Sequence, residues 1–381
     1  MQKTTETSLC LEDLTELCSR SVELQEYALA ADVQSNILIY NGDLLLRAAA
    51  MDADSVRKEI TRVLKDGPGV LVVKAAYADT GVIDRCTAVF RQILDQEQSA
   101  HGGPKKGDHF GDNERIWNSF QKVCLLDPDL FIDYFGNPLI ALVAKAWLGP
   151  GYQISAQMNT VKPGNKAQSA HRDYHLGFQS PEVVGQFPEH AQIMSQFLTL
   201  QGGIAHVDMP LELGPTRFLP FSQLYEMGYL AHKRIEFANY FEEHSVQLAL
   251  NKGDIVFFNP ALFHGAGTNL TQLDRVANLI QISSPFGKTM ETIDTLSMAK
   301  AVYPKLQSRV QAGTIDNRKV RDTIAAVADG YSFPTNLDRD PPLGGNAPKT
   351  SQQIMLEAIA GKWTVEQFHA ALDECFARRR P

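Results

Sequence analysis

Two histidines and one aspartate carry the clearest chemical signal in this sequence. His171 and Asp173 are separated by one residue, and His264 follows much later in the chain. If the segment around residue 171 is extended, the side chains of residues 171 and 173 point to the same side. One imidazole from a distant strand would then complete a 2-His-1-carboxylate set, which binds non-haem iron(II) and leaves coordination positions open. His171, Asp173 and His264 are therefore candidate metal ligands and candidate catalytic residues.

A His-x-Asp triplet is weak evidence by itself. In a chain with ten histidines, roughly 0.5 such triplets are expected by chance. A second triplet, His206-Val207-Asp208, stands immediately before a turn-rich stretch, residues 209–216. We interpret that second triplet as a histidine at a strand end followed by a turn-forming aspartate.

Arg275 could supply a binding group beside the metal. It follows His264 across a turn-forming stretch, residues 268–271. We predict a hairpin there, which would return Arg275 to the depth of His264 on a neighbouring strand. A guanidinium in that place can hold a carboxylate through two parallel hydrogen bonds. The alternative is an ordinary surface arginine.

The elements that must position these residues follow from the spacing of apolar residues. The chain before residue 150 is predicted to be mostly helical, with a first strand at residues 69–74. After residue 151, short β-rich segments alternate with glycine, proline and asparagine, which is typical of a sandwich or barrel. The chain after residue 287 is predicted to be helical, and Thr364 begins a capping box. The predicted β-rich segments are 152–161, 196–200, 203–207, 216–219, 245–250, 254–258 and 276–283.

One long loop interrupts this pattern. Residues 101–118 are polar, contain four glycines and end in Arg115-Ile116-Trp117. A loop of this length is a plain surface loop or a functional segment, such as a lid over a substrate.

Composition limits the class of protein. The 381 residues are 44% hydrophobic and 21% charged, as in ordinary globular proteins, and the net charge of -8 argues against a nucleic-acid partner. Five scattered cysteines without a C-x-x-C pair argue against a disulfide framework or a thiolate zinc site, so we expect a reducing, cytoplasmic location. The N-terminus lacks the apolar core of a signal peptide, and no apolar stretch is long enough to cross a membrane, so we expect no membrane partner.

Four motifs in the same order resemble the phytanoyl-CoA dioxygenase family of iron(II)/2-oxoglutarate oxygenases. They are His171-x-Asp173, Gly214-Pro215-Thr216, Gly253-Asp254 and His264-Gly265-x-Gly267 with Arg275, and the resemblance spans residues 69–287. It implies a mainly β, α+β fold with a double-stranded β-helix (jelly-roll, cupin-like) core between helical extensions. We thus predict a single domain, 1–381, with a helical part at 1–150, the core at 151–287 and a C-terminal extension at 288–381.

The resemblance also assigns roles to individual residues. It implies that His171, Asp173 and His264 bind iron(II), and that Arg275 binds the distal carboxylate of 2-oxoglutarate. Lys122 and Met158 match two further residues of the family's co-substrate pocket. Gln201 stands where the family often has an aromatic residue, and we place it in the same pocket as a departure from the pattern.

The implied reaction uses O2 and 2-oxoglutarate to hydroxylate a C–H bond of a small molecule, with release of succinate and CO2. An aspartate at position 173 favours hydroxylation over halogenation, while desaturation and ring formation stay open. One alternative is a metal-dependent cupin-type enzyme, an isomerase or dioxygenase, that does not use 2-oxoglutarate and has no need of Arg275. Another is a non-catalytic jelly roll that only binds a ligand.

Overall fold

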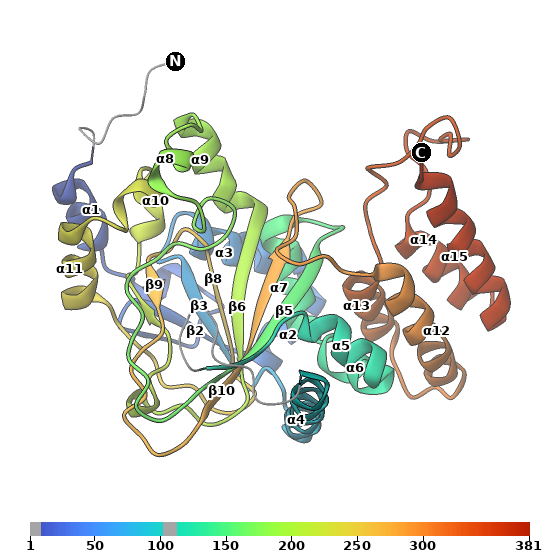
Figure 1. Ribbon diagram of the computed structural model, residues 1–381, viewed down its shortest axis with the longest axis horizontal. Helices are drawn as coiled ribbons and strands as arrows, with labels where there is room; N and C mark the ends of the chain where they lie inside the picture. Colours follow the sequence, from blue (N-terminus) through green and yellow to red (C-terminus); the bar gives the residue numbers. More distant parts are fainter. Residues whose placement is uncertain (1–8, 102–112) are drawn as a thin grey trace.

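A large sheet lies at the centre of the computed structural model, which describes residues 9–101 and 113–381 (Figure 1). Its eight strands follow the order β1-β2-β3-β8-β6-β10-β5-β4. All neighbouring strands are antiparallel except β2 and β3. The strands in chain order are β1 (Asp32–Gln34), β2 (Ile37–Asn41), β3 (Val70–Lys74), β4 (Glu114–Ile116), β5 (Gln153–Val161), β6 (Thr199–Ala205), β8 (Ile255–Phe258) and β10 (Arg275–Ser283).

A second, smaller sheet faces the inner side of the large one. Its regular part is β7 (Arg217–Phe218) paired with β9 (His264–Gly265). Single bridges add residue 171 beside residue 264, and residue 246 beside residue 218. Side chains from both sheets line one shared cavity. This arrangement confirms the predicted α+β fold with a double-stranded β-helix, or jelly-roll, core.

Helices cover the outer side of the large sheet, which is why its central strands are buried on both faces. The helices before β5 are α1 (Leu11–Cys18), α2 (Gly42–Met51), α3 (Ala53–Lys65), α4 (Gly81–His101), α5 (Ser119–Leu126), α6 (Pro128–Tyr134) and α7 (Pro138–Leu148). Those inserted between the core strands are α8 (Pro181–Val184), α9 (Glu189–Ser195), α10 (Gly228–Ala231) and α11 (Ile235–His244).

The C-terminal extension packs against the N-terminal helices at one side of the molecule (Figure 1). It consists of α12 (Thr295–Gln311), α13 (Asn317–Val327), α14 (Ser351–Ala360) and α15 (Val365–Arg379). Arg309 of α12 forms ion pairs with Asp129 and Asp133 of α6. The predicted capping box at Thr364 is present at the start of α15. No helix in the described part of the chain is both long and apolar enough to cross a membrane.

The N-terminal part differs from the sequence-based expectation. Within residues 9–101 and 113–150 it supplies four strands, β1 to β4, where the apolar pattern indicated one. Residues 37–40 are an apolar run within the part of the chain that the sequence predicts to be mostly helical. They form β2 instead, because pairing with β3 buries the run in the sheet. Of the predicted lid, residues 102–112 lie outside the described part, and residues 114–116 form β4 at the edge of the sheet.

Candidate active site

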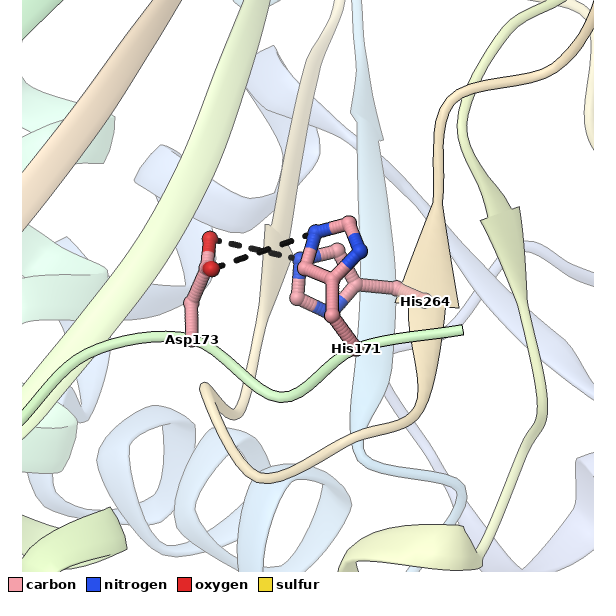
Figure 2. Close-up of side chains that lie close together, drawn as sticks. All are labelled: His171, Asp173 and His264. Atoms are coloured by element: carbon pink, nitrogen blue, oxygen red, sulfur yellow. Dashed lines mark ion pairs between the residues drawn. The ribbon is translucent and has the colours of Figure 1, made fainter. Parts of the chain in front are cut away.

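The backbones of two neighbouring segments bring the three candidate ligands together. The amide of His171 donates to the carbonyl of His264 at 3.0 Å, and the amide of His264 returns a bond to His171 at 3.1 Å. This pairing places the two imidazole rings with their centroids 4.4 Å apart. The amide of Asp173 donates to the carbonyl of Pro260 at 3.1 Å, which holds the aspartate beside the same loop. Figure 2 shows the Asp173 carboxylate facing both rings.

The three side chains form a compact donor set. One ligand atom from each of His171, Asp173 and His264 lies within 4.8 Å of the other two. Nε2 of His171 is 3.9 Å from Oδ1 of Asp173, and Nε2 of His264 is 3.5 Å from Oδ2 (Figure 2). Two imidazole nitrogens and one carboxylate at such separations can take one face of an octahedral metal ion.

Hydrogen bonds behind the rings fix which nitrogen faces the shared centre. Nδ1 of His171 lies 3.0 Å from the carbonyl of Ser169, and Nδ1 of His264 lies 2.8 Å from the carbonyl of Leu262. Because a carbonyl only accepts, both Nδ1 atoms carry hydrogen and both Nε2 atoms present a lone pair. Metal-ligating histidines are usually oriented by such a bond.

Electrostatics favour the protonation states that a cation needs. Burial lowers the pKa of His171, and the neighbouring His264 lowers it further, so the ring is neutral at pH 7. Burial alone would raise the pKa of Asp173, but the two imidazoles and the amide of Gln201 hold it well below its usual range. Neutral imidazoles and an ionised carboxylate are the forms that bind metal.

The residue between the ligands points away from them. The guanidinium of Arg172 is fully buried and donates to the carbonyls of Ser222 and Tyr225 at 2.6 and 2.7 Å. A Cβ added to Gly228 would lie only 1.9 Å from the guanidinium carbon, so a larger residue there would have to displace the guanidinium. Arg172 thus anchors the segment from behind, and its neighbours His171 and Asp173 face the cavity.

The donor set opens into a cavity of about 380 Å³ between the two sheets. Arg275 lies in the cavity wall and is 7% exposed. Among the described residues it makes one hydrogen bond, a long one of 3.4 Å to the carbonyl of Gly267, and no carboxylate pairs with it. Burial lowers the pKa of Arg275 to about 10, so it stays charged at neutral pH.

The predicted hairpin between His264 and Arg275 is wrong. β9 pairs with β7 in the small sheet, whereas β10 pairs with β5 and β6 in the large one. The chain crosses from one sheet to the other after Gly265. His264 and Arg275 still line the same cavity, because the inner faces of the two sheets enclose it.

Of the other predicted pocket residues, one lies in the cavity and two do not. Gln201 lines the cavity and donates to Asp173. Met158 belongs to the main hydrophobic core on the opposite face of β5. Lys122 forms an ion pair with Glu97 of α4 and is not among the residues that line the cavity.

Several amide side chains in the cavity wall were not anticipated. Gln157 and Asn159 of β5 and Gln281 of β10 share the inner face of the large sheet with Gln201. Strand alternation through 152–161 was the available signal, since residues 157, 159 and 161 must share one face. The Oδ1 of Asn159 and the Oε1 atoms of Gln201 and Gln281 are buried without a hydrogen-bond partner among the described residues. Such a wall suits a polar ligand.

The second His-x-Asp triplet has the structural role proposed for it. His206 is 2% exposed, and its ring nitrogens lie 2.8 Å from Oγ1 of Thr87 and 2.7 Å from the hydroxyl of Tyr134. Burial lowers its pKa to about 3. Asp208 accepts a bond from the amide of Lys252 in a turn. Both ring nitrogens of His206 are occupied, so it offers no ligand atom.

Comparison with solved structures finds distant likenesses. The structure of SnoN, described as an epimerase in complex with Fe3+, alpha ketoglutarate and nogalamycin RO, is 18% identical with a TM-score of 0.43. It covers 61% of this chain and 84% of SnoN. SnoK, a non-heme alpha ketoglutarate dependent carbocyclase from nogalamycin biosynthesis, is 20% identical with a TM-score of 0.43, covering 61% of this chain and 86% of SnoK. Likenesses this distant carry no information about the reaction.

Comparison with curated proteins finds no match. Comparison with protein families matches residues 55–277 to the model described as phytanoyl-CoA dioxygenase (PhyH). That match spans more than half of the chain and contains His171, Asp173, His264 and Arg275. A match of this extent, over the residues that build the cavity and its donor set, means that the chain belongs to the phytanoyl-CoA dioxygenase family.

Proposed function

We propose that this chain is an iron(II)- and 2-oxoglutarate-dependent dioxygenase that hydroxylates an unactivated C–H bond of a small-molecule substrate. His171, Asp173 and His264 would hold the iron, and Arg275 would bind the distal carboxylate of 2-oxoglutarate. Iron(II) with bound 2-oxoglutarate and O2 would supply the oxidising chemistry, with release of succinate and CO2. The chain's own residues bind, orient and shield these groups.

One observation carries the proposal. Arg275 is a buried arginine without a carboxylate partner among the described residues, and it shares a cavity with the three ligands. Burying a guanidinium without a counter-charge is costly, so a site of this kind fits an anion supplied by a ligand. A dicarboxylate that reaches both the metal and Arg275 meets this need. Two further observations agree, namely the depressed pKa of Asp173 and the Nε2 lone pairs directed at one centre.

Hydroxylation is favoured over halogenation by Asp173. A carboxylate at that position is a third protein ligand, and it occupies the place that a halide would need. The amide-rich wall formed by residues such as Gln157, Asn159 and Gln281 favours a small polar substrate. Product masses from a panel of such substrates decide the outcome, since hydroxylation adds one oxygen atom and desaturation or ring formation removes two hydrogens.

Succinate formation from 2-oxoglutarate with iron(II) and ascorbate tests the proposal directly. Arg275→Lys keeps the charge but loses the planar fork, so we expect 2-oxoglutarate to bind more weakly by about 2 kcal/mol, or about thirty-fold in Kd. Arg217→Lys is the matched control, because Arg217 is also largely buried but already pairs with Glu242. Equal 2-oxoglutarate affinity in wild type and Arg275→Lys would contradict the assignment. Turnover without 2-oxoglutarate would favour a cupin-type enzyme.

A further inference from the structure

Gln201 makes a hydrogen bond that no motif of the sequence anticipates. Its Nε2 lies 2.7 Å from Oδ2 of Asp173. A carboxylate only accepts hydrogen bonds, so the amide must turn its N–H group toward Asp173. Among the described residues, Gln201 is the only side chain outside the donor set that donates to this carboxylate. We propose that Gln201 is a positioning residue, which fixes the rotation of Asp173 so that one carboxylate oxygen is left for the metal.

The location of Gln201 supports this role. It lies on the inner face of β6, in the rigid centre of the large sheet, and is 4% exposed. Asp173, by contrast, lies outside any strand, in an irregular segment that follows the single bridge at His171. A carboxylate on such a segment can rotate and bind a metal through one or two oxygens. A bond from a packed strand removes that freedom, as bonds behind metal ligands commonly do.

The carbonyl oxygen of the Gln201 amide gives a second argument. Oε1 of Gln201 is buried and has no partner among the described residues. Leaving a buried carbonyl unsatisfied costs free energy, which a leucine of similar size would avoid. Packing alone therefore does not explain a glutamine at position 201, whereas its hydrogen bond to Asp173 does. This inference rests on the proposed metal site.

The chain offers a matched control on the neighbouring strand. Gln281 of β10 stands directly opposite Gln201 in the antiparallel register. It lines the same cavity, is 5% exposed and also has a buried Oε1 without a partner among the described residues. No bond joins it to Asp173. Gln281→Leu therefore lowers the polarity of the cavity wall as Gln201→Leu does, but it leaves the hydrogen bond to Asp173 in place.

The test measures metal binding to the purified full-length chain with cobalt(II), by calorimetry and by visible absorption, without any substrate. We expect Gln201→Leu to weaken cobalt binding about ten-fold or more, and Gln281→Leu to remain near wild type. Gln201→Glu keeps the shape but replaces the N–H donor with an acceptor, so Asp173 loses its bond and the cobalt spectrum should again differ from wild type. Freed from its bond, Asp173 should also bind through both oxygens, which changes the cobalt absorption spectrum.

The outcomes separate the two proposals. If the wild-type chain binds no metal, the proposed function fails. If wild type binds cobalt, and both Gln201 variants bind it with wild-type affinity and spectrum, the role of Gln201 is refuted while the metal site stands. Thermal unfolding of the metal-free variants identifies a folding defect, and Gln201→Glu then replaces Gln201→Leu in the comparison. Equal losses in Gln201→Leu and Gln281→Leu would also refute it, because they would point to cavity polarity.

Discussion

At the scale of single residues, the site depends on which atom of each side chain faces the cavity. Carbonyls of Ser169 and Leu262 occupy the Nδ1 atoms of the two histidines, and Arg172 anchors the segment from behind. These bonds hold each side chain in the orientation that a metal ligand needs. A set organised in this way loses little conformational freedom when it binds an ion.

The first prediction concerns these ligands. Alanine at position 171, 173 or 264 removes one of three protein ligands, so iron(II) binding and succinate formation should both fall below detection. Calorimetric titration with iron(II) or cobalt(II) under anaerobic conditions measures the effect. His244→Ala, at an exposed histidine outside the cavity, should bind like wild type. Loss of metal binding in His206→Ala with retention in His171→Ala would show that the wrong triplet was assigned.

At the scale of elements, strand alternation decides which side chains face the cavity. On β5, Gln157 and Asn159 line the cavity, whereas Ala156 and Met158 belong to the main core. Adjacent residues on one strand therefore have unrelated roles. The same rule places Gln201 inside the cavity.

A second prediction follows for β5. Asn159→Leu should weaken 2-oxoglutarate or substrate binding, because it removes a polar group from the cavity wall. Met158→Leu conserves volume in the core and should cost less than about 1.5 kcal/mol of stability while leaving both affinities unchanged. Titration of the iron-loaded protein with 2-oxoglutarate compares the two variants. Weaker 2-oxoglutarate binding by Met158→Leu, with unchanged binding by Asn159→Leu, would instead indicate that Met158 contacts the co-substrate.

A third prediction concerns the contact between the sheet and the helices. His206 bonds to Thr87 of α4 and Tyr134 of α6, and burial lowers its pKa from 6.5 to about 3. Between pH 6.5 and pH 3, His206 is protonated in the unfolded chain but stays neutral in the folded chain. Its contribution to the free energy of unfolding is therefore complete above pH 6.5 and is lost as the pH falls toward 3. The loss approaches about 1.4 kcal/mol per pH unit for this histidine.

Urea unfolding of the metal-free protein at several pH values between 7.5 and 4.5 measures this slope. The free energy of unfolding of His206→Gln should fall less steeply with decreasing pH, by the slope attributed to His206. Burial also lowers the pKa of His232 to about 3, so a double variant with His232→Gln should flatten the slope further. Identical pH dependence in the wild type and both variants would rule out these histidines as the cause.

At the scale of the whole molecule, one hydrophobic core joins all three parts of the chain. It includes Tyr40 from β2, Ile154 from β5, and Tyr303 and Phe368 from the C-terminal helices. Ion pairs at Arg309 add to the same contact. A shared core of this kind supports the prediction that residues 1–381 behave as one domain.

The fourth prediction tests whether the chain folds as one domain. Calorimetry of the full chain should show one unfolding transition. Removing residues 288–381 exposes apolar surface on α5, α6 and α7, so the shortened chain should aggregate or lose cooperative unfolding. A stable fragment 1–287, together with two transitions in the full chain, would instead make the extension a separate domain.

Local chemistry in the sequence was sufficient for the candidate ligands, the fold class and the family. His171-x-Asp173 needs only an extended segment to direct two side chains to one side, and the glycine-, proline- and β-rich pattern after residue 151 is typical of a sandwich or barrel. The family resemblance narrowed that choice to a jelly roll. The capping box at Thr364 is equally local. These inferences rest on neighbours in the chain, whose geometry is set by short-range rules.

Only the tertiary structure decided how distant segments meet. Nothing local shows that β9 and β10 enter different sheets, that residues 37–40 pair with β3, or that Met158 turns away from the cavity. Nothing local pairs Gln201 with Asp173, and nothing local leaves Arg275 buried without a carboxylate partner in the described part of the chain. Each of these facts depends on strand partners far apart in sequence, and the choice of partner is made by burial of whole faces in the folded chain.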